Sequence, residues 1–195
     1  GEDVKVLGNN FLIMDYRPGI VIGSNLPEMW ANDASVAKKV TAHLLEILIE
    51  LHNISPNEIG LSKLGRPEGY LERTANGWFK RAQIMWPAEL PKTVHYIMSW
   101  LKDNKVAEQA PVLLHNDFKL DNIIFNPKNL NPVALIDWDL GTRGDPLWDL
   151  AVLLSYWAEP NDPKPMLELG QMPTTSMGFP RRQDIIDIYA SKSGR

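Results

Sequence analysis

The segment HNDFKLDN at residues 115–122 and the segment IDWD at residues 136–139 decide the fold and chemistry that we expect from this 195-residue sequence. A short run of β-forming residues at 112–114 leads into the first segment. Functional residues are found disproportionately on loops that a rigid scaffold holds in place. We therefore expect the functional site at these two segments.

The two segments are joined by what reads as a β-hairpin. Residues 123–125 and 133–136 are short apolar runs, and residues 126–132 between them are rich in Asn and Pro. If the runs pair as antiparallel strands, the expected register places Asn122 opposite Asp137. Facing residues in such a ladder have Cα atoms about 4.5–5.5 Å apart.

Side-chain oxygens at this end of the hairpin suit a magnesium ion. The amide of Asn122 and the carboxylate of Asp137 are hard oxygen ligands, of the kind that holds Mg²⁺ jointly with substrate phosphates. Asp117, five residues upstream of Asn122, is then left to accept a proton or to orient a hydroxyl. The competing interpretation is that these Asp and Asn side chains only form turns and caps.

Helical periodicity dominates the rest of the sequence. After Asp33, a residue type that caps helices, apolar residues recur at steps of three and four up to His52, which we expect as a core or helix-end residue. Further helices are expected over residues 70–82, 94–101 and 147–157. A last helix begins near Arg181 and has only just formed where the sequence ends, after a long loop at 159–180.

Composition excludes several classes of protein. Twenty Lys and Arg against 24 Asp and Glu give a net charge of −4, so no basic footprint for nucleic acid is expected. The lack of cysteine excludes disulfides, cysteine-ligated zinc and a cysteine nucleophile. No apolar stretch is long enough to span a bilayer, and no membrane partner is expected. The prediction is a soluble, cytoplasmic chain.

The motif His-x-Asp-x-x-x-x-Asn followed by Ile-Asp-Trp-Asp resembles the catalytic core of the aminoglycoside phosphotransferase and choline kinase group. Within it, GRPEGYLER at 65–73 and GDPLWDLA at 144–151 are most similar to the kinase-like domain related to acyl-CoA dehydrogenase family members. The resemblance implies an α+β, protein-kinase-like fold. It further implies that the chain is mainly the helical C-terminal lobe with a catalytic-loop hairpin.

The resemblance also implies roles for individual residues. Asp117 is the implied catalytic aspartate, and Asn122 and Asp137 are the implied Mg²⁺ ligands. The implied nucleotide-binding residues are a hinge and an apolar floor below adenine: Met14, Asp15, Arg17, Ile124 and Ile136. His115 and Asp149 are implied to be structural supports of the catalytic loop.

The sequence departs from the family pattern in three respects. Asn116 stands where glycine is usual, but asparagine tolerates left-handed backbone angles. Asp139 stands where glutamate is frequent, which leaves its role open. No glycine-rich loop or strand lysine precedes the hinge, so we expect residues 1–19 to be the end of the N-terminal lobe and hinge strand, and 20–195 a C-terminally truncated catalytic lobe. Such a fragment is expected to be inactive alone and to self-associate through the surface left by the missing lobe.

The predicted function is an ATP- and Mg²⁺-dependent transfer of the γ-phosphoryl group to a hydroxyl of a small molecule. The alternatives are a pseudokinase or nucleotide-binding module without turnover and, ranked last, a metal-dependent phosphohydrolase. The sequence does not decide whether the acceptor molecule is cationic or anionic. A cationic acceptor would suit Glu159, Asp162 and Glu168, whereas an anionic one, such as a hydroxyacyl thioester, would suit a basic segment: Lys63, Arg66, Arg73, Lys80 and Arg81.

Overall fold

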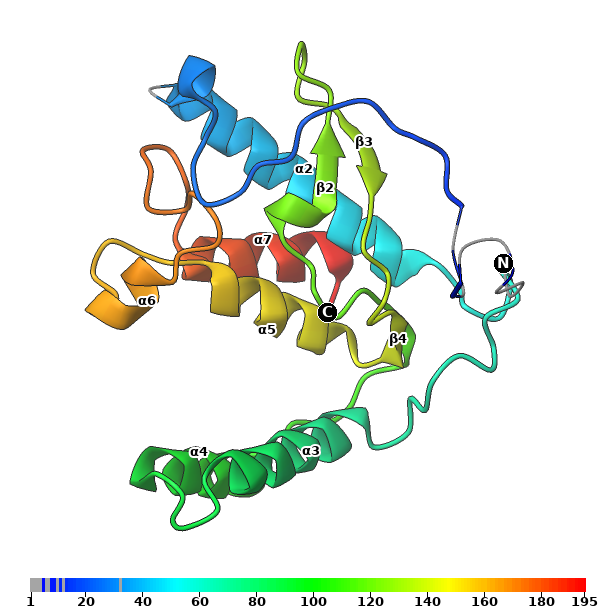
Figure 1. The fold of residues 1–195 in the computed structure, drawn as a ribbon, viewed down its shortest axis with the longest axis vertical. Coiled ribbons are helices and arrows are strands. Elements are labelled where there is room, and N and C mark those ends of the chain that lie inside the picture. The colour runs from blue at the N-terminus through cyan, green and yellow to red at the C-terminus, as the bar shows by residue number, and fades with distance from the viewer. Residues whose placement is uncertain (1–4, 6–7, 10, 12, 32) are drawn as a thin grey trace.

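Helices form a main body and a separate arm, and two small antiparallel β-ladders lie in the body (Figure 1). The computed structural model describes residues 5, 8–9, 11, 13–31 and 33–195. The order of the elements is η1 (Glu28–Trp30), α2 (Ala34–Asn53), α3 (Tyr70–Met85), α4 (Lys92–Asp103), β1 (Val112–Leu114), η2 (Leu120–Asn122), β2 (Ile123–Phe125), β3 (Pro132–Leu135), β4 (Thr142–Gly144), α5 (Pro146–Tyr156), α6 (Lys164–Glu168) and α7 (Arg182–Ser193).

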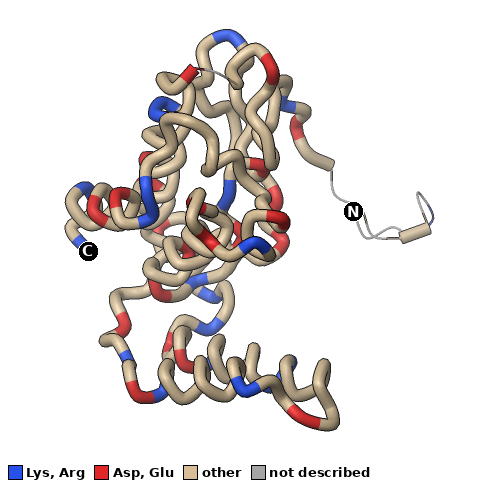
Figure 2. Tube along the Cα trace, turned by 90° about the vertical axis from the view of Figure 1, so that its left-hand side faces the viewer, with Lys and Arg blue, Asp and Glu red and all other residues tan. Residues whose placement is uncertain are grey.

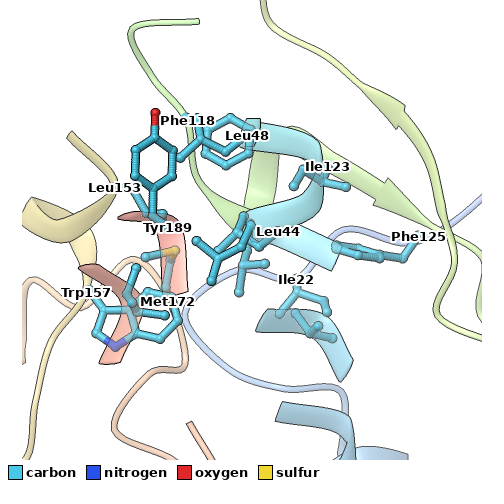
Figure 3. Close-up of a cluster of buried hydrophobic side chains, with 14 of the residues drawn as sticks. Ile22, Leu44, Leu48, Phe118, Ile123, Phe125, Leu153, Trp157, Met172 and Tyr189 are labelled. Atoms are coloured by element: carbon cyan, nitrogen blue, oxygen red, sulfur yellow. The ribbon is translucent and has the colours of Figure 1, made fainter. Parts of the chain in front are cut away.

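Helix α2 is the centre of the body. The Asp33 side chain caps it by accepting a hydrogen bond from the Ser35 amide at 2.8 Å, as the sequence predicted. The apolar stripe of α2, including Leu44 and Leu48, is fully buried. Figure 3 shows side chains from the 115–122 segment, α5 and α7 gathered around this stripe. Burial of α2 therefore holds together segments that lie far apart in the sequence.

The β2–β3 hairpin forms as predicted, but its register differs from the predicted one by a residue. Ile123 pairs with Leu135, and the Ile136 amide donates to the carbonyl oxygen of Asn122 at 2.9 Å, so Asn122 lies opposite Ile136 and not opposite Asp137. The reason is the side-chain alternation of the ladder. The observed register puts Leu135 on the core side with Ile123, whereas the predicted one would put it on the opposite face.

Three elements were missed or misjudged from sequence. The TRG stretch of β4 pairs with β1, with Leu113 opposite Arg143, although no local pattern predicts a strand there. The expected long loop contains α6. The last helix, α7, runs through 12 residues and ends at Gly194, whose φ of 71° closes it with a left-handed cap. The expectation of a helix that has only just begun was therefore wrong.

Helices α3 and α4 pack side by side and project away from the body (Figure 1). Tyr70, the first residue of α3, is buried against β1 and Trp148. No other residue of α3 or α4 is buried. Much of the arm's apolar surface is therefore exposed, including Trp78 and Trp100.

Charges of opposite sign are interspersed along the chain (Figure 2). Within the described residues, no helix is both long enough and apolar enough to cross a membrane.

Close packing at Gly144 gives a testable consequence for stability. A Cβ at this position would lie 2.6 Å from Tyr70 Cγ and 2.8 Å from Leu114 Cδ1. We expect Gly144→Ala to lower the free energy of unfolding by about 1–3 kcal/mol, the usual cost of overpacking. Urea denaturation measures this change.

The matched control is Gly23→Ala, because a Cβ at Gly23 meets no atom within 4 Å. It should leave stability within about 1 kcal/mol of the parent. Equal effects of the two substitutions would contradict the packing described at Gly144.

Candidate active site

A buried carboxylate on α5 holds the start of the 115–122 segment. Asp149 has no exposed surface. Its Oδ2 accepts a hydrogen bond from the His115 amide and its Oδ1 one from the Asn116 amide, each at 2.7 Å. Asn116 has a φ of 67°, so the chain turns through a left-handed conformation immediately before Asp117. This pair of hydrogen bonds determines where the loop leaves β1.

Two further buried residues lie behind Asp149. His52, near the end of α2, has Nε2 at 3.4 Å from Asp149 Oδ2 and Nδ1 at 2.7 Å from the Tyr189 hydroxyl. His52 is thus a core residue, one of the two placements expected for it. Burial raises the pKa of Tyr189, which keeps its hydroxyl protonated at neutral pH. The network joins α2, α5 and α7 to the loop.

His115 links the two polar segments. Its Nε2 lies 2.8 Å from the carbonyl oxygen of Ile136, which can only accept, so Nε2 carries the proton. Its Nδ1 is 3.3 Å from the Asp117 amide and accepts from it. The ring is fully buried and packs against Trp138 in a tilted arrangement, with centroids 4.9 Å apart and an interplanar angle of 52°. Both ring nitrogens are therefore occupied by backbone groups.

Asp117 lies at the centre of a group of donors. Its Oδ1 accepts from the Tyr156 hydroxyl at 2.8 Å, and its Oδ2 from Lys119 Nζ at 3.0 Å and Asn122 Nδ2 at 3.1 Å. Burial raises the pKa of Asp117, but the hydrogen bonds from Lys119, Tyr156 and Asn122 and the charge of Lys119 together lower it by more, so it lies below its ordinary value. The carboxylate is consequently ionised at neutral pH.

Lys119, Asp121 and Tyr156 were assigned no role from the sequence. Lys119 Nζ lies 3.8 Å from Asp121 and 5.0 Å from the centre of the Tyr156 ring. Burial raises the pKa of Asp121; the nearby charge of Lys119 lowers it, and those of Asp117 and Asp137 raise it further. Lys119 and Asp121 lie within the His-x-Asp-x-x-x-x-Asn motif, so their positions in the sequence could have indicated them as site residues. Tyr156 follows Asp149 by seven residues on one helix, and this spacing was the only feature of the sequence that could have indicated Tyr156.

Asn122 and Asp137 are the two residues that the sequence predicted as magnesium ligands, and they lie in different surroundings. Asn122 Nδ2 donates to the backbone oxygen of Asp117 at 2.7 Å as well as to its carboxylate, so the amide oxygen is directed away from Asp117. Asp137 is exposed and has a φ of 64° at the end of the hairpin. Asp121 Oδ1 is buried and has no hydrogen-bond partner among the described residues. Within the described residues, no group of three or more His, Cys, Asp or Glu side chains is arranged to hold a metal ion.

The residues expected to bind the nucleotide are only partly brought together. Ile124 and Ile136 are half-buried on the hairpin, and Ile20 pairs with Phe125 through hydrogen bonds of 2.9 and 2.7 Å. Met14, Asp15 and Arg17 are exposed, and Arg17 forms an ion pair with Asp15 at 2.9 Å. Within the described part of the chain, no side-chain hydrogen bond or ion pair joins these three residues to Ile124 or Ile136.

The acidic residues proposed for a cationic acceptor are already paired. Arg182 contacts Asp162 at 2.7 and 2.5 Å and Glu159 at 3.5 Å, and Lys164 lies 3.4 Å from Glu168.

In the basic segment, Arg73 donates to the carbonyl oxygens of Glu68 and Arg66, and Arg81 lies over the Trp78 ring. Two of the five cations are thus engaged locally.

The sequence pattern of the phosphotransferase enzyme family matches residues 1–183. The chain belongs to this phosphotransferase family. It is similar to acyl-CoA dehydrogenase family member 11 of Homo sapiens, with 31% identity over 197 residues that cover 99% of this chain and 24% of that protein. The chain thus spans about a quarter of the length of that curated relative.

Solved structures of phosphotransferases share the fold. A Ralstonia eutropha JMP134 protein assigned to the aminoglycoside phosphotransferases superposes with a TM-score of 0.79 and 25% identity, covering all of this chain and 58% of its own. The streptomycin–ATP–APH(2″)-IIa ternary complex superposes with a TM-score of 0.53 and 19% identity, covering 92% of this chain and 56% of its own. The expected family and kinase-like mixed fold are therefore confirmed.

The hydrogen bonds to Asp149 can be tested by Asp149→Asn. Asparagine keeps one carbonyl oxygen, so one of the two loop amides loses its acceptor. A buried polar group without a partner costs about 1–3 kcal/mol. We expect the free energy of unfolding to fall by at least that amount in chemical denaturation.

Asp103→Asn is the control, because Asp103 is exposed at the end of α4. Surface substitutions of this kind change stability by about 0.5 kcal/mol or less. A change no larger than this for Asp149→Asn would show that the buried bonds contribute nothing net.

Proposed function

We propose that this protein transfers the γ-phosphoryl group of ATP, in the presence of Mg²⁺, to a hydroxyl group of a small molecule. The observation that carries the proposal is that Asp117 is ionised and held by hydrogen-bond donors. Its carboxylate is ionised, held by three donors, and adjacent to an amide whose oxygen is free to take a cation. This is the arrangement that phosphoryl transfer to an alcohol requires.

In the proposed reaction, the acceptor oxygen forms a bond to the γ-phosphorus while the bond from that phosphorus to the bridging oxygen of ADP breaks. The acceptor hydroxyl proton goes to the Asp117 carboxylate. Asn122 and Asp137 would hold Mg²⁺, which supplies neutralisation of phosphate charge when bound. The contribution of the chain is therefore placement of groups and electrostatics rather than covalent chemistry.

Two further roles belong to the apolar and backbone parts of the site. Ile124 and Ile136 provide half-buried apolar surface on the hairpin for the adenine ring, and Met14, Asp15 and Arg17 provide the hinge. The comparison with a ternary complex that holds ATP and streptomycin supports a nucleotide and a small hydroxylated molecule as the two substrates.

The full-length protein with Mg²⁺ and ATP, screened against hydroxylated small molecules for acceptor-dependent ADP formation, tests the proposal. ATP binding without transfer to any acceptor would support the nucleotide-binding module instead. Phosphate release that needs no acceptor would support a phosphohydrolase.

The base is tested by Asp117→Asn in the full-length protein. Asparagine preserves the shape of the side chain but cannot take the proton, so kcat should fall by about 10²–10⁴, the contribution usual for a general base. Steady-state kinetics with saturating ATP measure kcat. Asp103→Asn should keep the parent rate. Turnover of Asp117→Asn within about threefold of the parent would remove Asp117 from this role.

The metal ligand is tested by Asp137→Ala. Only the phosphates are held through the ion, so affinity for Mg²⁺-ATP should fall while affinity for adenosine stays close to that of the parent. Calorimetry with the two ligands gives both dissociation constants. An equal loss for both ligands would assign Asp137 a structural role.

A further inference from the structure

Helix α5 presents two residues to the catalytic segment from one face. Asp149 and Tyr156 are seven residues apart, which is two turns of an α-helix, so their side chains lie on the same side. Asp149 binds the amides of His115 and Asn116, and Tyr156 donates its hydroxyl to Asp117. The same helix therefore holds the backbone that precedes Asp117 and the carboxylate itself.

The end of α5 is anchored so that Tyr156 cannot easily turn away. Trp157, the next residue, is fully buried, and its Nε1 donates to the carbonyl oxygen of Pro180 at 3.0 Å. Lys119 Nζ lies 5.0 Å from the centre of the Tyr156 ring. Burial raises the pKa of Tyr156, and its hydrogen bond to Asp117 raises it further, so the phenol remains a donor at neutral pH.

The hydrogen bonds to Asp117 leave room for one more donor. An ionised carboxylate has about four lone-pair positions, two on each oxygen. Lys119 and Asn122 use the two on Oδ2, and Tyr156 uses one on Oδ1. Among the described residues, the remaining position is therefore on Oδ1, the oxygen that Tyr156 binds. A hydroxyl that gives its proton to Asp117 has to approach beside that of Tyr156.

Tyr156 also lines a cavity of about 340 Å³ between the end of α5 and α6. Ala158, Pro165, Met166 and Leu169 form its apolar part. The volume is within the range of small-molecule sites, which is about 300–1,000 Å³. Tyr156 thus borders a space of small-molecule size and also donates its hydroxyl to Asp117.

We propose that Tyr156 is a positioning residue: its hydroxyl orients Oδ1 of Asp117 toward the acceptor, and the residue also borders the cavity between the end of α5 and α6. The inference rests on the proposed phosphotransferase function. It assigns to α5 a part in the reaction through a side chain outside the His-x-Asp-x-x-x-x-Asn motif.

Tyr156→Phe separates the two parts of this role, because phenylalanine keeps the ring and removes only the hydroxyl. In the full-length protein we expect kcat to fall roughly tenfold to hundredfold, as for loss of a hydrogen bond to a charged group. KM for the acceptor and for ATP should stay within about twofold. Tyr96→Phe, an exposed tyrosine on α4, is the matched control and should keep the parent rate.

The split between kcat and KM gives a readout that a merely structural role would not move. Disturbed packing around Tyr156 would raise KM, whereas loss of the hydroxyl alone should lower kcat and leave both KM values within about twofold. An unchanged kcat in Tyr156→Phe would overturn the inference.

A measurement without turnover distinguishes this inference from the proposed function. Assigned tyrosine ¹³Cζ NMR should show a lower Tyr156 pKa in Asp117→Asn than in the parent, because Asp117 raises it. If the parent transfers phosphate to no acceptor, the proposed function fails, and this titration still decides whether the Tyr156 hydroxyl is bound to Asp117. The comparison does not depend on the folding of Tyr156→Phe, and an unchanged Tyr156 pKa would overturn the inference.

Discussion

The contact between the Asp149 carboxylate and the amides of His115 and Asn116 is the constraint on which the site depends. Each carboxylate oxygen accepts one backbone hydrogen bond at 2.7 Å, so the loop is held at two successive residues. A fully buried carboxylate would be costly without such partners. Here the cost is offset by the two amides and by His52, which in turn contacts Tyr189. The position of Asp117 thus depends on the packing of α2, α5 and α7.

Three side chains of the 115–122 segment form the hydrogen bonds that position the rest of the site. His115 reaches the carbonyl oxygen of Ile136 and so fixes the segment that carries Asp137 relative to the one that carries Asp117. Asn122 closes the other end of the loop by donating to the backbone and carboxylate of Asp117. Asn116, where the family usually has glycine, uses its side chain to join the Tyr70 hydroxyl to the carbonyl oxygen of Leu140. The departure therefore adds a link between the arm and the loop.

The acidic residues that follow α5 in the sequence form ion pairs with basic side chains. Arg182 contacts Glu159 and Asp162, and Lys164 contacts Glu168, so each of these three acids has a basic partner. The cavity that Tyr156 borders has a mainly apolar lining, which includes Ala158, Pro165 and Met166. The exposed apolar surface of the α3–α4 arm is the other large feature of the molecule.

The sequence by itself determined the helices with strong periodicity, the Asp33 cap, the hairpin and the residues clustered in the two motifs. These depend on local spacing and on residue types whose preferences act over a few positions. Only the tertiary structure decided the hairpin register, because Leu135 had to share the core face with Ile123. It also decided the strand at Thr142–Gly144, which exists because β1 offers a partner, and the convergence of His52, Asp149 and Tyr189. Contacts between residues about 30 to 140 positions apart leave no local pattern in a single sequence, so the role of Tyr156 became visible only when α5 was packed against the loop.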